Sequence, residues 1–197
     1  MTPAIVLFDL GDVLARFDPA PRWAEYARRS GITPAEVVAR LSTDGFWQDT
    51  DRGRYSADEM ERRICDLLGC RFSRAELLRL QAAAFTLRPE VLRIAARVAT
   101  HSRVGVLTNN APLLKEALPI HLPELARAFD PILYSFEFGH VKPERALFEA
   151  VTARLALLPR EIFFVDDQEG HVAGARAAGW GALRFETANQ LERALPR

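Results

Sequence analysis

The chain of 197 residues has the length of one ordinary domain, or of one domain that carries a modest insertion. Hydrophobic residues make up 49% and charged residues 26%, which is the balance of a globular domain that folds in water. Lysine plus arginine equals aspartate plus glutamate, at 26 each, so no overall charge attracts nucleic acid or an anionic membrane. We therefore expect neither of these as a partner.

The chain carries no pattern of a targeting or membrane segment. Its first ten residues place Asp9 inside an apolar run and contain no basic leader, which argues against a secretory signal. No apolar run approaches the ~20 residues that a membrane helix needs. Cys65 and Cys70 have no further metal ligands at a suitable spacing, so we expect two reduced thiols. A cytoplasmic protein is expected.

Three short apolar runs, rich in β-branched and aromatic residues, each end in polar residues. They are residues 4–8 before Asp9, residues 104–107 before Thr108 and Asn109, and residues 162–165 before Asp166 and Asp167. Such runs predict strands that are buried on both faces of a parallel sheet. Weaker strand candidates are residues 132–134 and 182–185. Ligands bind beyond the carboxyl ends of such strands, so the polar residues mark the expected site.

Helical patterns separate these strands. They are predicted over residues 90–100 after Pro89, residues 144–157 after Pro143, and residues 169–178 before Gly179. Proline suits the first turn of a helix and glycine its C-terminal cap. The alternation predicts an α/β fold with a doubly wound parallel-sheet core.

The stretch between residues 17 and 87 shows helical patterns and no convincing strand. Three capping boxes begin helices there, at residues 33–36, 56–59 and 73–76. We therefore predict a core domain formed by residues 1–16 and 88–197, with a small all-helical cap domain, residues 17–87, inserted after the first strand.

Carboxylates follow two of the predicted strands. Asp9 alone is explained equally well as a turn or capping residue, but Asp166 and Asp167 would converge on it across neighbouring strands. Clustered carboxylates repel each other unless a cation lies between them, and oxygen ligands suit Mg²⁺. The sequence therefore favours a magnesium site at this edge.

Polar and basic residues elsewhere fit a phosphate site. Thr108 and Asn109 offer a hydroxyl and backbone N–H groups that can hold phosphoryl oxygens, although a turn or helix cap explains them as well. Lys142 lies beside a predicted helix start and would neutralise charge next to the carboxylates. A lone lysine is more commonly a solvated surface charge.

Four elements in this order resemble motifs of the haloacid dehalogenase superfamily. They are residues 8–14, residues 107–109, Lys142 with Pro143, and residues 164–167 followed by residues 174–179. The helical insertion also falls where that family places its smaller cap. Within the superfamily the chain looks most similar to the bacterial α-D-glucose-1-phosphate phosphatase type, on residues 8–11, residues 87–91, and residues 52–53 before Ser56.

The resemblance implies a hydrolase that uses Asp9 as a covalent nucleophile and forms an aspartyl-phosphate. It implies that Asp9, the backbone carbonyl of Gly11 and Asp167 bind Mg²⁺. Asp166 would be a further ligand or the partner of Lys142.

The resemblance also implies the remaining roles at the site. Thr108 and Asn109 would hold the phosphoryl oxygens, and Lys142 would offset charge in the transition state. The expected ligand is a small phosphorylated metabolite.

The chain departs from the family pattern at two positions. Gly11 stands where most phosphatases of the family carry a second aspartate, the general acid, and Asp12 is one residue away and expected to point elsewhere. His171 stands where Asp or Asn is commoner. We expect His140 and His171 to have surface or structural roles.

Substrate choice is expected to lie in the cap. Residues 46–55 mix aromatic residues with arginines. Trp47 would stack on a sugar face, and Arg52 or Arg54 would bind an anion. Phe46 and Trp47 fit the cap core equally well.

Three functions are compatible with these residues. A phosphatase is favoured. A 2-haloacid dehalogenase also lacks the second aspartate, but such enzymes work without metal, so the pair Asp166 and Asp167 counts against it. A non-catalytic phosphometabolite-binding protein is suggested by Gly11, but pure binding does not require the nucleophile Asp9. The sequence does not distinguish a monomer from a homodimer.

Overall fold

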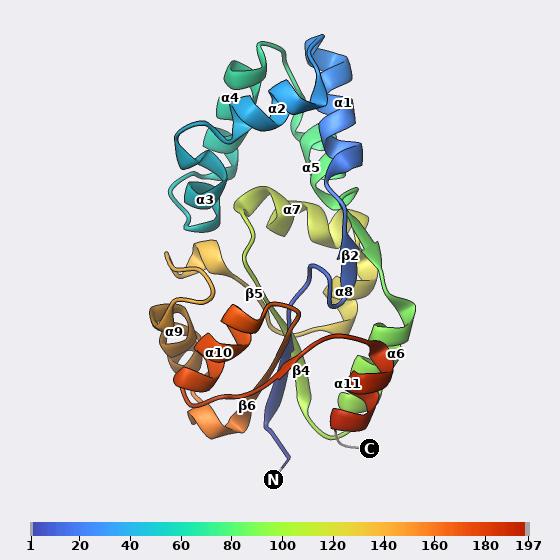
Figure 1. Ribbon diagram of the computed structural model, residues 1–197, viewed down its shortest axis with the longest axis vertical. Helices are drawn as coiled ribbons and strands as arrows, with labels where there is room; N and C mark the ends of the chain where they lie inside the picture. Colours follow the sequence, from blue (N-terminus) through green and yellow to red (C-terminus); the bar gives the residue numbers. More distant parts are fainter. Residues whose placement is uncertain (1, 196–197) are drawn as a thin grey trace.

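The computed structural model describes residues 2–195, and its centre is a parallel sheet. Five strands lie in the order β5-β4-β1-β6-β7 (Figure 1). They are β1 (Ile5–Phe8), β4 (Arg103–Thr108), β5 (Ile132–Tyr134), β6 (Ile162–Asp166) and β7 (Gly181–Arg184). The predicted α/β fold with a parallel sheet is confirmed, and both weaker strand candidates form strands.

Helices cover both faces of this sheet. One face is covered by α9 (Arg145–Leu155) and α10 (Glu169–Ala177), and the other by α6 (Pro89–Val98), α7 (Pro112–His121), α8 (Pro123–Ala128) and α11 (Ala188–Ala194). In β1, Ile5 and Leu7 share a hydrophobic cluster with α9 and α10, whereas Val6 and Phe8 share one with the helices of the opposite face. All four side chains are fully buried, which explains why the strand reads as a continuous apolar run.

The predicted helices are present with slightly shorter limits. Gly179 ends the last of them with a φ of 87°, a left-handed conformation that favours glycine. Gly174 in α10 lies so close to the start of α9 that a Cβ atom there would be 2.7 Å from the Pro143 carbonyl oxygen. A bare backbone at this position lets α10 pack tightly beside the segment that carries Lys142.

Five helices fill the insertion. They are α1 (Ala20–Ser30), α2 (Pro34–Leu41), α3 (Phe46–Asp51), α4 (Ala57–Leu68) and α5 (Arg74–Ala82), and they lie above the carboxyl edge of the sheet in Figure 1. All three predicted capping boxes are formed, at the starts of α2, α4 and α5. Short 3₁₀ turns complete the elements, η1 (Thr43–Gly45), η2 (Ser135–Glu137) and η3 (Pro159–Glu161).

The prediction that residues 17–87 contain no strand is wrong at both ends. An antiparallel ribbon of β2 (Ala15–Phe17) and β3 (Phe85–Leu87) leads the chain into the helices and out again. Strands of three residues are too short to show an alternating pattern, so the sequence does not reveal them. Within residues 2–195 no helix is long and apolar enough to cross a membrane.

Candidate active site

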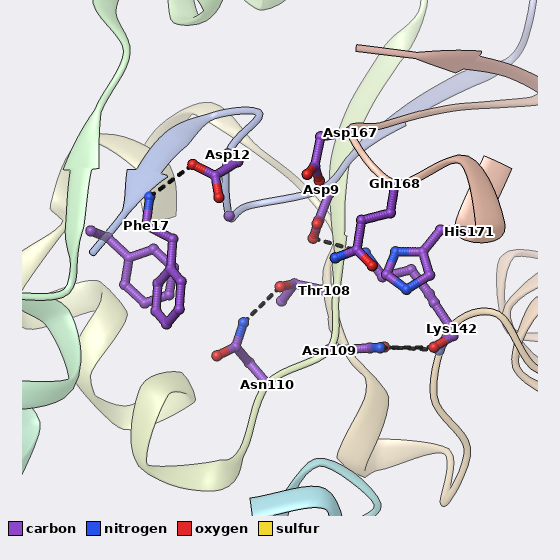
Figure 2. A pocket seen from close by; sticks show the side chains of 12 residues that line it. Asp9, Asp12, Phe17, Thr108, Asn109, Asn110, Lys142, Asp167, Gln168 and His171 are labelled. Atoms are coloured by element: carbon purple, nitrogen blue, oxygen red, sulfur yellow. Dashed lines mark hydrogen bonds and ion pairs between the residues drawn. The ribbon is translucent and has the colours of Figure 1, made fainter. Parts of the chain in front are cut away.

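The carboxyl ends of three neighbouring strands, β1, β4 and β6, meet at one edge of the sheet and bring the predicted residues together. Asp9 follows β1, Thr108 ends β4, and Asp167 follows β6. These three line one cavity of about 300 Å³ together with Asn109 and Lys142 (Figure 2). The buried Asp166 lies beside Lys142 and does not line the cavity.

Lys142 lies buried between two carboxylates. Its Nζ is 2.8 Å from Asp9 Oδ1 and 2.7 Å from Asp166 Oδ2. It also donates a hydrogen bond to the Leu107 carbonyl oxygen at 3.2 Å. Burial alone would lower the pKa of Lys142, but the two carboxylates outweigh it and raise that pKa. The side chain is therefore held as a charged ammonium group.

The side chain of Asn109 holds the backbone of Lys142 in place. Asn109 Nδ2 donates to the Lys142 carbonyl oxygen at 3.0 Å, and the Lys142 N–H donates to Asn109 Oδ1 at 2.9 Å. The oxygen and one N–H of this amide are occupied, which leaves its second N–H and the backbone N–H of Asn109 for a phosphoryl group. The hydroxyl of Thr108 accepts from Asn110 Nδ2 at 2.7 Å, which leaves its O–H free to donate into the cavity.

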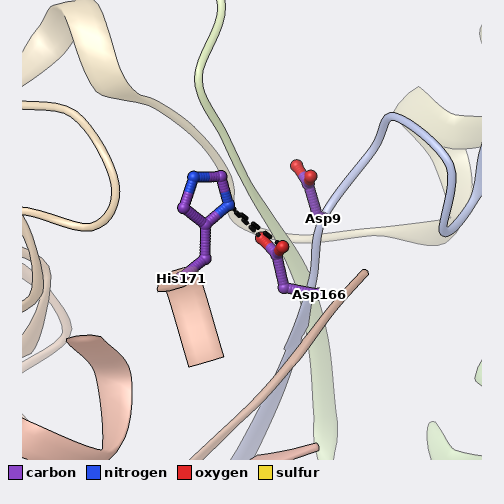
Figure 3. A group of neighbouring side chains, drawn as sticks. All are labelled: Asp9, Asp166 and His171. Carbon is purple, nitrogen blue, oxygen red and sulfur yellow. Dashed lines mark hydrogen bonds and ion pairs between the residues drawn. The ribbon is translucent and has the colours of Figure 1, made fainter. Parts of the chain in front are cut away.

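Asp166 has both carboxylate oxygens in use (Figure 3). Oδ2 accepts from Lys142, and Oδ1 accepts from the Gln168 N–H at 2.9 Å and lies 3.0 Å from His171 Nδ1. Burial would raise the pKa of Asp166, but the contacts with His171 and Lys142 more than offset it and lower that pKa. Asp9, Asp166 and His171 lie close enough together to hold a metal ion, but Asp166 and His171 already satisfy each other. The geometry favours Asp166 as the partner of Lys142.

Asp9 and Asp167 present oxygens to the cavity. Asp9 Oδ1 is used by Lys142 and the Leu10 N–H, whereas no hydrogen bond within residues 2–195 reaches its Oδ2. Burial raises the pKa of Asp9, and the attraction of Lys142 offsets this only in part. The pKa of Asp167 is raised by burial and then by the charges of Asp166 and Asp12.

The charges around the cavity favour a further cation. Asp9, Asp166 and Asp167 face the single ammonium group of Lys142, so negative charge is in excess. Asp9, Gly11 and Asp167 line the cavity, and two carboxylates with a backbone carbonyl would form a donor set of oxygens only. Such a set fits Mg²⁺.

The turn after β1 has an unusual shape that brings Asp12 to the cavity. Asp12 has a φ of 56°, and it lines the cavity, contrary to the expectation that it points elsewhere. Its Oδ1 accepts from the Phe17 N–H at 3.2 Å and lies 3.9 Å from Arg88 Nη2. These contacts hold the Asp12 side chain within the turn.

The remaining predicted residues lie further out. Phe46 is buried in the core between the cap helices, and Trp47 lines a second cavity. Arg52 forms an ion pair with Glu144, Arg54 forms one with Asp49, and neither arginine lines either of the two cavities. His140 lies 3.4 Å from Glu144. His171, in contrast, is buried and lines the first cavity, where it contacts Asp166.

Sequence reasoning missed three polar residues of the second cavity. Arg22, Asp51 and Gln81 line it beside Trp23 and Trp47. Arg22 and Gln81 are 59 positions apart and form a buried hydrogen bond, and no local pattern in the sequence signals such a contact.

Comparison with known proteins places this geometry in a family of hydrolases. A model of haloacid dehalogenase-like hydrolases matches residues 3–179. A phosphatase of Mycobacterium tuberculosis is 28% identical over 96% of this chain and 90% of its own length. A D-ribitol-5-phosphate phosphatase of Bacteroides thetaiotaomicron is 24% identical over 92% of this chain and 91% of its own length.

A solved structure has the same fold. A haloacid dehalogenase family enzyme of Bacteroides thetaiotaomicron, in complex with magnesium and inorganic phosphate, superposes with a TM-score of 0.78 at 20% identity. The match covers 93% of this chain and 94% of that one. With the family model spanning most of the residues, the chain belongs to the haloacid dehalogenase-like hydrolases.

Proposed function

We propose that the protein is a Mg²⁺-dependent phosphatase that hydrolyses a small phosphate ester through an aspartyl-phosphate on Asp9. The observation that carries this proposal is the buried ammonium group of Lys142, 2.8 Å from Asp9 and 2.7 Å from Asp166, beside a cavity with free carboxylate oxygens. The two phosphatases among the relatives support the same activity.

Each residue at the cavity has a role in this reaction. Oδ2 of Asp9 attacks phosphorus, the bond from phosphorus to the leaving oxygen breaks, and water then releases phosphate from Asp9. The Thr108 hydroxyl and the Asn109 N–H donate to phosphoryl oxygens. Lys142 holds Asp9 and offsets charge on the transferred group.

The oxygen donors would hold the metal. Asp9, the Gly11 carbonyl and Asp167 would bind Mg²⁺, which neutralises charge on the phosphoryl group when it is bound. Asp166 would orient Lys142 through the ion pair with its Nζ. In this proposal residues 1–16 and 88–197 supply the chemistry, and residues 17–87 act as a cap domain that selects the substrate.

The finer proposal concerns the leaving group. No carboxyl side chain stands at Gly11, and the Asp12 side chain is engaged within the turn, where it accepts from the Phe17 N–H and lies 3.9 Å from Arg88 Nη2. An anomeric oxygen is a better leaving group than an ordinary sugar alcohol, because the ring oxygen withdraws charge from the adjacent carbon. We therefore favour a sugar 1-phosphate, as in the α-D-glucose-1-phosphate phosphatase type.

The alternative functions fit less well. A 2-haloacid dehalogenase would use the same nucleophile without metal, which leaves the carboxylate of Asp167 at the cavity without a role. A pure binding protein would have no use for a buried lysine that orients a nucleophile.

Asp9→Asn should lower turnover of phosphate esters by at least ~10³-fold, because an amide does not attack phosphorus. The fold should persist, since Asp9 lies at a strand end. A screen of phosphate esters with Mg²⁺, combined with circular dichroism of the variant, measures both. Asp66→Asn, at an exposed position of α4, is the matched control and should retain activity. Native-like turnover in Asp9→Asn would exclude the covalent mechanism.

Asp167→Asn should remove the response to Mg²⁺ and raise the stability of the metal-free protein. The pKa of Asp167 is raised, so its ionised form destabilises the fold above that pKa. This destabilisation disappears as the pH falls below the ordinary value, near 3.9. At pH 7, with chelator, we expect the variant to unfold about 1–3 °C above the native protein, because Asp167 is partly solvated.

Thermal unfolding with and without Mg²⁺ checks this prediction. Mg²⁺ should raise the unfolding temperature of the native protein and not that of Asp167→Asn. Chelation should abolish ester hydrolysis, and added Mg²⁺ should restore it. Undiminished hydrolysis after thorough chelation would contradict a metal-dependent reaction.

The absence of an acid at Gly11 predicts a steep dependence of rate on leaving-group acidity. General acid assistance typically supplies ~10²–10⁴-fold in rate, so esters with poor leaving groups should be slow by about that factor. Gly11→Asp should accelerate them selectively, because a Cβ at Gly11 meets only Phe17 Cβ, at 3.7 Å. The measurement is kcat/KM across esters of graded leaving-group pKa. A flat dependence in the native protein would identify Asp12 as a proton donor after all.

A further inference from the structure

The second cavity, of about 260 Å³, directly adjoins the catalytic one. Phe17, Asn109 and Asn110 line both cavities. A phosphate ester whose phosphoryl group lies between Asp9 and Asn109 would therefore extend its leaving group past these residues into the second cavity.

Arg22 is the main polar feature of this cavity. Its side chain is buried, and within residues 2–195 it forms no ion pair. Nη1 donates to Gln81 Oε1, and Nε has no hydrogen-bond partner. Burial lowers the pKa of Arg22, while the charge of Asp51 works against this. A buried guanidinium with unused donors is unfavourable by itself, so a ligand that accepts hydrogen bonds is expected beside it.

Gln81 and Asp51 complete the polar part of the cavity. Gln81 is buried, its Oε1 is occupied by Arg22, and its Nε2 has no partner within the described chain. Asp51 lies at the end of α3, where burial raises its pKa to about 7 although Arg22 lowers it. No ion pair joins Asp51 to another residue of the described chain. The residues that line the cavity thus include donors and an acceptor that have no partner within the described chain.

Two indole rings form the apolar wall. Trp23 and Trp47 have ring centroids 5.8 Å apart, and the Arg22 guanidinium lies 4.4 Å from the centroid of Trp23. Aromatic walls with a few placed polar groups are typical of small-molecule sites.

The mixture of charges selects the chemistry of the ligand. Asp51 would repel a carboxylate, and Arg22 would repel an ammonium group. A hydroxyl group accepts from Arg22 or Gln81 and donates to Asp51 at the same time. We propose that the second cavity binds the leaving group of the substrate and that this group is a sugar or polyol, held by Arg22, Gln81 and Asp51 against Trp23 and Trp47. This inference rests on the proposed phosphatase function.

The test uses esters whose leaving groups differ in size and charge, and it compares each variant with the native protein on the same esters, so that differences in leaving-group acidity cancel. The probes are α-D-glucose 1-phosphate and ribitol 5-phosphate as polyol esters, 3-phosphoglycerate as a carboxylate, phosphoserine as a zwitterion, and acetyl phosphate, whose leaving group is too small to reach Arg22. The readout is kcat/KM for each ester divided by that for acetyl phosphate.

In Arg22→Gln this ratio should fall by about 10- to 100-fold for the preferred polyol ester, mainly through KM. Asp51→Asn should lower it less, and it carries the test if Arg22→Gln fails to fold. Arg28→Gln is the matched control, because Arg28 lies on the same helix but is exposed and paired with Glu25. Its ratio should be that of the native protein.

The outcomes separate this inference from the proposed function. A native preference for 3-phosphoglycerate or phosphoserine would overturn the polyol assignment. An equal loss on acetyl phosphate and on the polyol esters would show that Arg22 only supports the fold, and would overturn the site. Failure to hydrolyse any ester, acetyl phosphate included, would instead contradict the phosphatase function itself.

Discussion

The ammonium group of Lys142 lies buried between Asp9 and Asp166, and both the arrangement of the site and the packing of the strand ends around it depend on these two ion pairs. The two carboxylates come from neighbouring strands, β1 and β6, and Asn109 after β4 fixes the lysine backbone. Removing Lys142 would leave both buried carboxylates without a counter-charge, and breaking a buried pair in this way destabilises a protein by about 3–5 kcal/mol. The same contacts therefore orient Asp9, the proposed nucleophile, and tie three strand ends together, and the excess of carboxylate charge favours the binding of a cation.

The helical segment is held over this site at two places. The ribbon of β2 and β3 carries the chain in and out, and on the other side Ser135 Oγ donates to the Asp51 carbonyl oxygen at 2.7 Å. Beside it, Gly53 approaches the loop after β5 so closely that a Cβ would lie 2.3 Å from the Phe136 carbonyl oxygen. Arg52 strengthens this contact through Glu144. Arg52, which was predicted to bind substrate, thus joins the inserted helices to the segment before α9, and Arg22 is the arginine that lines the second cavity.

The sequence predicts an element well where the pattern that identifies the element lies within one short segment. Buried parallel strands read as apolar runs, and each capping box needs only four residues, so β1, β4, β6 and the starts of α2, α4 and α5 could be predicted. The strands β2 and β3 could not, because three residues show no period and their pairing joins distant segments. The same holds for the site. Asp9 and Lys142 follow from the motifs, but the contact of Arg22 with Gln81 and the use of the Asn109 amide depend on tertiary packing.

The central claim is that a phosphoryl group is transferred to Asp9 and that water then attacks the phosphorus atom of this aspartyl-phosphate. A single turnover of acetyl phosphate in water labelled with oxygen-18, with protein in excess and Mg²⁺ present, tests this claim most directly. After acid quenching during the reaction, mass spectrometry should find a phosphoryl group on the peptide that contains Asp9. After completion, the heavy oxygen should be in the released phosphate and absent from Asp9. Heavy oxygen in the Asp9 carboxylate, or turnover without any phosphorylated Asp9, would contradict the account.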